Sequence, residues 1–423
     1  MPILFSDVTV VPMDGAPQVL EHAYVAVEGT KIASVGTEPP EGTFDRVVDG
    51  AGKVLLPGFV NAHTHLPMTL MRGYGGGCDL HTWLNQYIFP AEARLDSRAV
   101  AAGAGLGLAE MIASGVTCVA DMYMHTGTIA EQILEAGISA NLSCGGVYFG
   151  APEDFSPETC GDCRNQAALT EEWHGAGAGQ ILVDASVHGE YTSNPPLWRW
   201  MAEYAAEHRL GMHVHVSETQ SEHQASLERW GKTPIQALDG CGVWDCGRSL
   251  AAHCVYTTEE DWALMAEKGI SCVHNPWSNL KLGSGVAPIP AMMRAGVNVA
   301  LGTDGMSSHN SADLFSDIKL AAVLHNGVER DPMAVNAWAA LEMATVNGAR
   351  ALGRDTGVIA PGKTADLILV DLSAPNLIPC HDPVEDLVFS AHGSNVEMNM
   401  ARGQVIYEKG SFLTLDLERV RWE

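Results

Sequence analysis

The apolar positions of this chain recur in two patterns, which separate its ends from its centre. From residue 3 to about residue 53, short apolar segments such as 7–11 and 23–27 alternate with turns that contain Gly and Pro. The last stretch repeats this pattern, with 365–371 and 404–407 as candidate strands. We expect the two ends of the chain to pair in one small β domain.

In the central part, apolar β-type runs alternate with longer helical patterns, for example at 97–114 and 194–208. This alternation is typical of repeated βα units on a parallel sheet. Eight runs are present, at 55–65, 116–122, 138–148, 181–188, 212–218, 249–254, 270–274 and 297–304. Eight parallel strands close a barrel.

We therefore predict an α/β protein with three segments. Residues 57–354 form a (β/α)8 TIM-like barrel, and residues 1–56 and 355–423 together form a small β-sandwich domain.

Composition places the chain among globular proteins without nucleic-acid or membrane partners. Of 423 residues, 46% are hydrophobic and 18% are charged, so the chain can bury a substantial core. The net charge of −27 repels phosphate backbones and anionic bilayers. The first residues lack the basic and apolar regions of a secretory signal, and no charge-free stretch qualifies as a bilayer span. We expect a soluble, cytoplasmic protein that acts on a small molecule.

The ten cysteines fit this compartment, because thiols stay reduced in the cytosol. Cys160 and Cys163 form a single CxxC motif with no second pair at zinc-site spacing, and we interpret them as incidental thiols.

Several apolar runs end in residues that can bind a metal. His63 and His65 share one face of a strand, which is weak evidence alone. However, His215, His253 and Asp304 end other predicted strands, and the carboxyl ends of barrel strands meet at one pocket. Three imidazoles and one carboxylate complete a metal site with room for water.

The residue pair His213 and His215 leaves the third imidazole ligand open, because both lie on the same strand face. We favour His215, which stands three residues before Glu218 and so brings that carboxylate past the metal into the pocket.

These residue types predict hydrolysis. A divalent ion lowers the pKa of bound water from 15.7 to about 7, which supplies hydroxide at neutral pH. Asp304 can bind the metal and accept the proton of the water, and His253 can orient the hydroxide. Glu218 can carry a proton to a heterocycle nitrogen and to the leaving amine.

One ion is expected. A two-metal hydrolase would need a bridging carbamylated lysine from a middle strand, and no lysine lies between Lys53 and Lys232. Zinc, iron or manganese all suit three histidines and one aspartate. The competing metalloprotease motif HExxH is absent from the sequence.

The motifs at 57–65, 215–218, 252–254, 274–283 and 302–305 together resemble the amidohydrolase superfamily. Within it they are similar to the branch of 5-methylthioadenosine/S-adenosylhomocysteine deaminases. The resemblance covers nearly the whole chain. It implies His63, His65, His215 and Asp304 as ligands, one zinc ion, Glu218 as proton shuttle and His253 beside the hydroxide. It also implies a homo-oligomer, dimer or tetramer.

The same resemblance assigns substrate contacts. It places Glu92 on the ribose hydroxyls, His188 and Ser308 near the purine, and Arg164 on the carboxylate of S-adenosylhomocysteine. Trp83 is a further candidate, for apolar contact with a base or thioether.

This chain departs from the family pattern at one position. A second arginine that helps to hold the carboxylate matches Cys144 here. Losing one member of a charge-assisted pair weakens carboxylate recognition, which favours adenosine, 5′-deoxyadenosine or methylthioadenosine over S-adenosylhomocysteine.

Two alternatives stay open. The first is a guanine, cytosine-like or triazine aminohydrolase or chlorohydrolase of the same superfamily, for which Glu92 and Arg164 would have no ribose or carboxylate to meet. The second is a catalytically silent barrel with a role in assembly.

Overall fold

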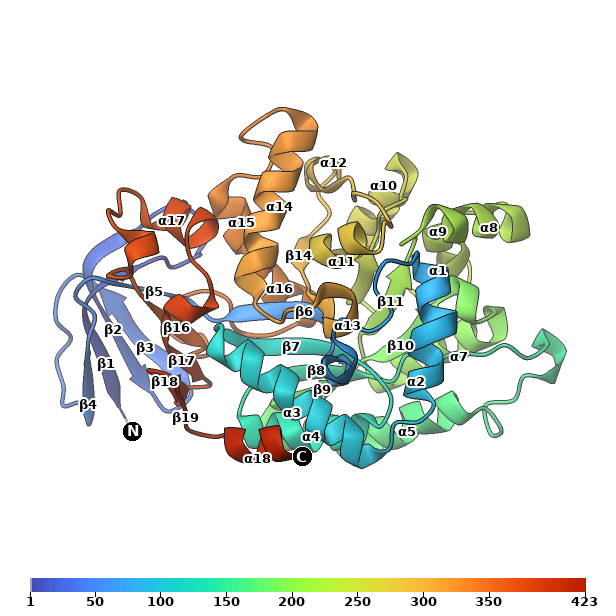
Figure 1. Cartoon of the computed structure of the whole chain (residues 1–423), viewed down its shortest axis with the longest axis horizontal. Helices are drawn as coiled ribbons and strands as arrows, with labels where there is room; N and C mark the ends of the chain where they lie inside the picture. The colour runs from blue at the N-terminus through green and yellow to red at the C-terminus, as the bar shows by residue number, and fades with distance from the viewer. Residues whose placement is uncertain (1) are drawn as a thin grey trace.

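The computed structural model describes residues 2–423 and contains one nine-stranded sheet and two five-stranded sheets (Figure 1). The five-stranded sheets are parallel throughout and run in the orders β15-β6-β7-β8-β9 and β10-β11-β12-β13-β14. Their strands are β6 (Phe59–His65), β7 (Val116–Met122), β8 (Ser139–Ser143), β9 (Ile181–Val183), β10 (Ala185–Gly189), β11 (Met212–Val216), β12 (Ser249–His253), β13 (Ile270–His274), β14 (Val299–Leu301) and β15 (Asp304–Gly305).

The two parallel sheets adjoin where the chain passes from one to the other. A single residue, Asp184, separates β9 from β10, and two residues separate β14 from β15. Gly146, just after β8, also bridges to Val187 in β10, and its N–H donates to the carbonyl of Ser186 at 3.2 Å. Counting β9 with β10 and β14 with β15, the ten central strands occupy eight positions, the number of runs in the sequence.

Both ends of the chain contribute to the nine-stranded sheet, at the left of Figure 1. Its order is β19-β18-β17-β16-β5-β1-β2-β3, and β4 pairs with β1. The first half supplies β1 (Ile3–Val10), β2 (Leu20–Glu28), β3 (Lys31–Gly36), β4 (Arg46–Asp49) and β5 (Lys53–Pro57). The second supplies β16 (Leu367–Asp371), β17 (Val396–Ala401), β18 (Gln404–Glu408) and β19 (Ser411–Phe412).

The join between the two ends is the antiparallel pair β5 and β16, with Leu55 opposite Leu369. The expectation that the two ends of the chain pair with each other is confirmed. Apolar side chains of both halves, among them Phe5, Val25 and Met398, form a separate buried cluster there. This terminal sheet therefore has a core of its own.

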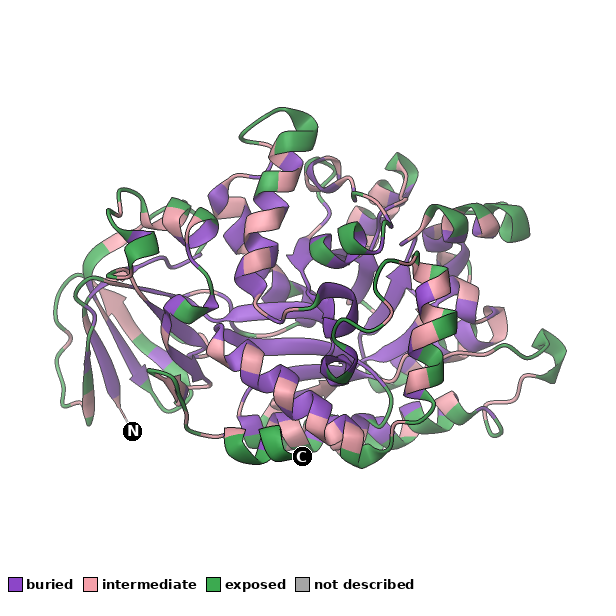
Figure 2. Ribbon diagram, viewed as in Figure 1, coloured by how far each residue is buried: buried purple, intermediate pink, exposed green. Residues whose placement is uncertain are grey.

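The helices lie outside the central sheets, and Figure 2 shows the strands buried beneath them. Every residue of β6, β7, β8, β11, β12 and β13 is buried, as expected for parallel strands covered by helices. The helices are α1 (Leu80–Trp83), α2 (Phe89–Glu92), α3 (Ser97–Ala113), α4 (Thr126–Ala136), α5 (Gly161–Trp173), α6 (Ala176–Gly179), α7 (Pro195–His208), α8 (Gln220–Trp230), α9 (Pro234–Asp239), α10 (Glu259–Lys268), α11 (Pro276–Lys281), α12 (Ile289–Arg294), α13 (Met306–His309), α14 (Leu314–Glu329), α15 (Ala337–Ala344), α16 (Val346–Leu352), α17 (Pro383–Phe389) and α18 (Leu417–Trp422).

Local signals in the sequence set several helix ends. At the start of α10, Thr258 and Asp261 form a reciprocal capping box, and Thr233 and Gln236 do the same for α9. Gly269 ends α10 with a φ of 67°, a left-handed conformation that glycine adopts without steric cost. In the described part of the chain, no helix has the length and apolarity needed to cross a membrane.

An ion pair between a buried carboxylate and a partly buried guanidinium occupies the break between β9 and β10. The guanidinium of Arg248 donates to both carboxylate oxygens of Asp184, at 2.5 and 3.2 Å, and also to the carbonyl of Leu352 at the end of α16. Asn141 of β8 donates to the same carboxylate at 2.9 Å. The pair thus links the two parallel sheets to α16.

We expect Arg248→Met to lower the free energy of unfolding by about 3 kcal/mol, because it leaves the Asp184 charge buried without its cation. The thermal unfolding midpoint measures this loss. Arg419→Met is the matched control, since it breaks an exposed pair with Glu135 and should change the midpoint far less. Equal losses in the two variants would contradict a role for the Arg248–Asp184 pair.

Candidate metal centre and active-site pocket

A cavity of about 560 Å³ lies at the carboxyl ends of the central strands. Its size is typical of a small-molecule site. His65 ends β6, His188 lies near the end of β10, His253 ends β12, and Asp304 begins β15. Apolar side chains form much of the remaining wall, among them Met68, Leu80, Trp83, Leu84, Phe89, Val147 and Phe149. The arrangement places a few polar groups at one end of an apolar pocket.

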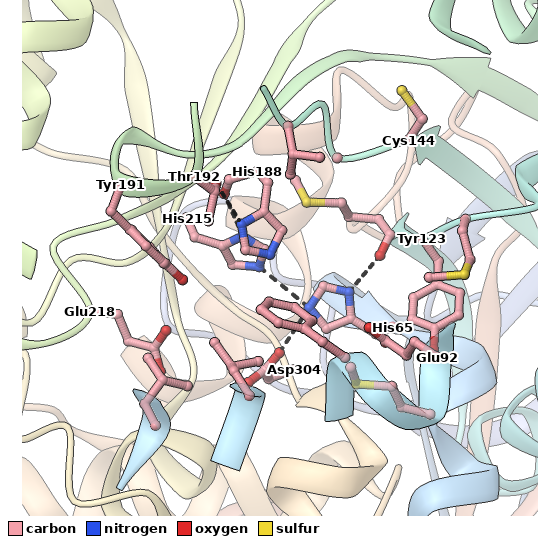
Figure 3. A pocket seen from close by; sticks show the side chains of 18 of the residues that line it. His65, Glu92, Tyr123, Cys144, His188, Tyr191, Thr192, His215, Glu218 and Asp304 are labelled. Atoms are coloured by element: carbon pink, nitrogen blue, oxygen red, sulfur yellow. Dashed lines mark hydrogen bonds and ion pairs between the residues drawn. The ribbon is translucent and has the colours of Figure 1, made fainter. Parts of the chain in front are cut away.

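Five polar side chains converge at that end. The sets His63, His215, His253 and His63, His65, Asp304 each have their ligand atoms within 4.8 Å of one another. Nε2 of His65 lies 3.3 Å from Nε2 of His215 and 3.2 Å from Oδ1 of Asp304. Figure 3 shows His65, His215 and Asp304 pointing toward one another. Residues far apart in the sequence therefore present donor atoms to a common point.

The other ring nitrogens have partners that orient these histidines. Nδ1 of His65 donates to the carbonyl of Met122 at 2.5 Å, and Nδ1 of His215 donates to the carbonyl of His188 at 2.6 Å. Both bonds put the proton on Nδ1 and leave the lone pair on Nε2, the atom at the convergence point. Backbone carbonyls thus fix the tautomer that a metal ligand needs.

His63 has a histidine behind it instead of a carbonyl. Its Nδ1 lies 2.8 Å from Nε2 of His213. Its own Nε2 is buried, 3.4 Å from Oδ1 of Asp304, and has no hydrogen-bond partner among residues 2–423. A buried polar atom without a partner is costly unless an ion or water satisfies it. His213 lies behind His63 and belongs to neither converging set.

Burial and charge set the protonation of the cluster. Burial lowers the pKa of His63 to about 3 and that of His215 well below its usual range. Neutral imidazoles are the form that binds a metal. Burial also acts against the charge on His65, but contact with Asp304 outweighs it and raises the pKa to about 9. For Asp304, burial raises the pKa, yet the neighbouring His63 and His65 hold it well below its usual range.

The Asp304 carboxylate is held on both sides. Its Oδ2 accepts hydrogen bonds from Ser278 Oγ at 2.5 Å and Ser308 Oγ at 2.9 Å, which leaves Oδ1 facing His63 and His65. Its φ of 59° is in the left-handed region, which a residue with a Cβ adopts at a cost. His253 and Ser217 share this conformation at the ends of β12 and β11, with φ of 75° and 48°. Backbone strain of this kind concentrates at functional sites.

These observations fit a divalent metal. The donor set combines three imidazole nitrogens and one carboxylate, each braced by a second contact, as in known sites for zinc and related ions.

Glu218 and His253 face the same point from the neighbouring strands. Oε2 of Glu218 lies 3.8 Å from Nε2 of His253. The Ser284 hydroxyl donates a hydrogen bond to Oε1 of Glu218 at 3.2 Å. Burial raises the pKa of Glu218, which makes this carboxyl group a better proton donor near neutral pH. His253 is held through Nδ1, which lies 2.8 Å from Oδ1 of Asn279.

Glu222, in the first turn of α8, holds the chain around Glu218. Its two carboxylate oxygens accept the backbone N–H groups of Ser217 and Glu218, at 2.9 and 2.8 Å. Burial raises the pKa of Glu222 to about 8.

The substrate residues expected from the sequence fall into two groups. Glu92, Trp83 and His188 line the cavity. Burial raises the pKa of Glu92 and lowers that of His188 to about 4. Ser308 is absent from the described cavity lining and instead donates to Asp304 and to the carbonyl of Gly305.

Arg164 also lies away from the described cavity lining. It is exposed on α5, and its guanidinium donates to the carbonyl of Glu158 at 2.7 Å. Cys144, which stands where the family pattern has a second arginine, does line the cavity.

Other residues of the site were missed from the sequence. Tyr123 and Tyr191 line the cavity, and Tyr123 follows β7 directly, so the rule that strand ends carry function could have found it. Asp162 lies inside the CxxC segment that was set aside. Ser278 and Ser284 stand in or beside the recognised 274–283 motif, but its sequence gives no sign of which carboxylate each one contacts.

Comparison with known proteins is consistent with this site. The amidohydrolase family model matches residues 54–406. The chain is 41% identical over 425 residues to a 5-methylthioadenosine/S-adenosylhomocysteine deaminase from Caldanaerobacter subterraneus subsp. tengcongensis, covering 100% of this chain and 97% of the relative. It is 40% identical over 397 residues to a 5′-deoxyadenosine deaminase from Methanothermobacter thermautotrophicus, covering 94% and 92% of the two chains.

Among solved structures, an adenosine deaminase from Xanthomonas campestris with bound zinc superimposes with a TM-score of 0.92. The two chains are 33% identical, and the match covers 99% of this chain and 96% of the other.

We expect the purified protein to hold about one divalent ion per chain and Asp304→Ala to lose most of it, because the carboxylate is the only anionic ligand of the set. Elemental analysis by mass spectrometry measures the content. His188→Gln is the control, since its side chain lines the cavity but only its backbone carbonyl supports His215. Full metal content in Asp304→Ala would remove this residue from the ligand set.

Proposed function

This chain belongs to the amidohydrolase family and is a hydrolase of carbon–nitrogen bonds, and we propose that it deaminates adenine nucleosides with the help of one divalent metal ion. The products are ammonia and the corresponding inosine analogue. The observation that carries the proposal is the convergence of His63, His65, His215 and Asp304 beside Glu218 at the end of a nucleoside-sized cavity.

The proposed metal ligands are the Nε2 atoms of His63, His65 and His215 and Oδ1 of Asp304. When bound, a divalent ion supplies a hydroxide nucleophile at neutral pH by lowering the pKa of water. We propose zinc, supported by the ligand types and by the zinc in the similar adenosine deaminase. Iron and manganese suit the same ligands.

The chain's own groups handle the protons. The Asp304 carboxylate, which its histidine neighbours keep ionised, accepts the proton released from water. Glu218, protonated at the start, delivers one proton to the ring nitrogen beside the reacting carbon, a role that its raised pKa favours. The proton on Asp304 passes to the leaving amine, which departs as ammonia, and the remaining proton of the water returns to Glu218 as the new carbonyl forms. His253, 3.8 Å from Glu218, orients the nucleophile and stabilises the charge that develops.

The rest of the cavity suits a nucleoside. Apolar side chains around Trp83 and Phe89 provide contacts for a purine, and His188 stands beside the ligand histidines. Glu92 is the buried carboxylate that we assign to the ribose hydroxyls. We expect adenosine, 5′-deoxyadenosine and 5-methylthioadenosine to be better substrates than S-adenosylhomocysteine, since no lysine or arginine is found in the described cavity lining.

The wider architecture completes the proposal. We propose that residues 57–354 act as one closed (β/α)8 barrel and that residues 1–56 and 355–423 fold over each other as a β-sandwich. The two joints between the parallel sheets support the first, and the separate apolar cluster of the terminal sheet supports the second. We further propose a cytoplasmic homo-oligomer, dimer or tetramer.

Glu218→Gln should lower kcat by about 10²–10⁴ and leave the metal content unchanged, because the amide cannot relay a proton while the ligands stay in place. Ammonia release from adenosine and elemental analysis measure the two effects. Glu228→Gln, the same change on the exposed face of α8, should keep the rate. A near-native kcat in Glu218→Gln would show that another group carries the proton.

Glu92→Gln should raise KM for adenosine by roughly tenfold and leave KM for 2′,3′-dideoxyadenosine nearly unchanged, because only adenosine offers a diol to the carboxylate. Steady-state kinetics on both nucleosides, beside guanine, cytosine and triazine substrates, test the assignment. Faster ammonia release from a bare base or a triazine than from any nucleoside would overturn the proposed substrate class in favour of the other amidohydrolase activities.

A further inference from the structure

The cavity has two chemically different ends. One holds the converging histidines, Asp304 and Glu218, and Figure 3 shows Cys144 on the side of the cavity away from Glu218. Val147 and Asp162 also line the cavity and lie beside Cys144, because the N–H of Val147 donates to Asp162 and the Asp162 charge acts on the Cys144 thiol. In the described chain, Asp162 is the carboxylate of this distal wall, and no cationic Lys or Arg side chain lines any part of the cavity.

Asp162 is fixed in position and has a free charge. It is the second residue of α5, and its Oδ2 accepts the N–H of Val147 at 2.8 Å. That bond holds the carboxylate against the cavity wall. Burial raises the pKa of Asp162, and the hydrogen bond from Val147 opposes this by favouring the ionised form. None of the ion pairs formed by residues 2–423 includes Asp162.

Asp162 also acts on its neighbour in the cavity. Burial raises the pKa of the Cys144 thiol, and the negative charge of Asp162 raises it further. The carboxylate field therefore extends over the distal wall, where it meets a neutral thiol and apolar side chains and no compensating cation.

We propose that Asp162 determines specificity for the 5′-substituent of the nucleoside, and that it selects neutral or ammonium-bearing substituents against carboxylates. The inference rests on the proposed deamination of adenine nucleosides, which puts the amine at the metal end and leaves the 5′-carbon toward the distal wall.

The expected selectivity between substituents follows from the negative charge of Asp162 in a partly buried cavity wall. A substituent ammonium can donate a charge-assisted hydrogen bond to Asp162, whereas a carboxylate would face a like charge and lose water without gaining a partner. A small apolar thioether has no charge to be repelled by Asp162 and little hydration to lose, and it packs against Val147. A purely structural Asp162, needed only to accept the Val147 N–H, would give none of this discrimination.

Three synthetic substrates of matched length test the proposal. They are adenosines whose 5′-oxygen is replaced by a thioether that carries a 2-aminoethyl, a 2-hydroxyethyl or a carboxymethyl group. We expect kcat/KM for ammonia release to fall in that order, with the aminoethyl compound preferred over the carboxymethyl compound by roughly tenfold or more, as for one charged hydrogen bond.

Asp162→Asn should bring the aminoethyl-to-carboxymethyl ratio close to one. Asparagine retains an oxygen for the Val147 N–H, so the wall keeps its shape, and an unchanged thermal unfolding midpoint would verify this. Asp154→Asn removes the same charge from an exposed position outside the described lining, and its ratio should match the wild type. This control separates Asp162 from the general attraction of a chain with net charge −27 for cations.

The results separate the two proposals. Turnover of the hydroxyethyl compound with equal or better use of the carboxymethyl compound would overturn this role of Asp162 and leave nucleoside deamination standing. An unaltered ratio in Asp162→Asn would likewise remove Asp162 from substrate selection. Failure to release ammonia from any of the three, and from adenosine, would instead reject the proposed deaminase function itself.

Discussion

Parallel strand register is the constraint on which the site depends. Parallel pairing brings the carboxyl ends of strands to one edge, so residues distant in sequence meet without long loops. Asp304 pairs with Thr64, between His63 and His65, and Val216 of β11, the residue after His215, pairs with His253 of β12. A shift of one residue in either pair would turn a ligand away from the cavity. The Arg248–Asp184 ion pair matters for the same reason, since it links the two sheets that carry these ligands.

The site contains several features that lower the stability of the folded protein, and contacts elsewhere in the fold must offset them. It buries several histidines, Glu218, Glu222 and Asp304 together, and it places Ser217, His253 and Asp304 in left-handed backbone conformations. Each feature is unfavourable alone. The surrounding contacts limit the cost, because carbonyls, serine hydroxyls and backbone N–H groups satisfy most of the buried polar atoms. The Nε2 atom of His63 is left without such a partner in the described chain, which is what a cation site requires.

Much of this organisation follows from the sequence. The apolar runs predicted the central strands and the pairing of the two ends, and polar residues at run ends indicated the converging ligands. The single-residue break at Asp184 has no local signal, because Asp184 stands inside one apolar run of the sequence and its partner Arg248 is distant in the chain. Arg164 and Ser308 show a different limit: residue type and motif position do not reveal whether a side chain points into a cavity or toward a neighbour such as Asp304. Asp162 was overlooked because the cysteines on both sides of it were interpreted as incidental thiols, and nothing else in the segment indicates a site.

The central claim is that one divalent ion binds where His63, His65, His215 and Asp304 converge. An anomalous difference map at the zinc absorption edge, from crystals of the protein grown with zinc, tests it most directly. The account predicts one strong peak, about 2.0–2.2 Å from the Nε2 atoms of the three histidines and from Oδ1 of Asp304. A peak held by His213 in place of His215, a second peak of equal strength in the cavity, or no peak at these residues would contradict it.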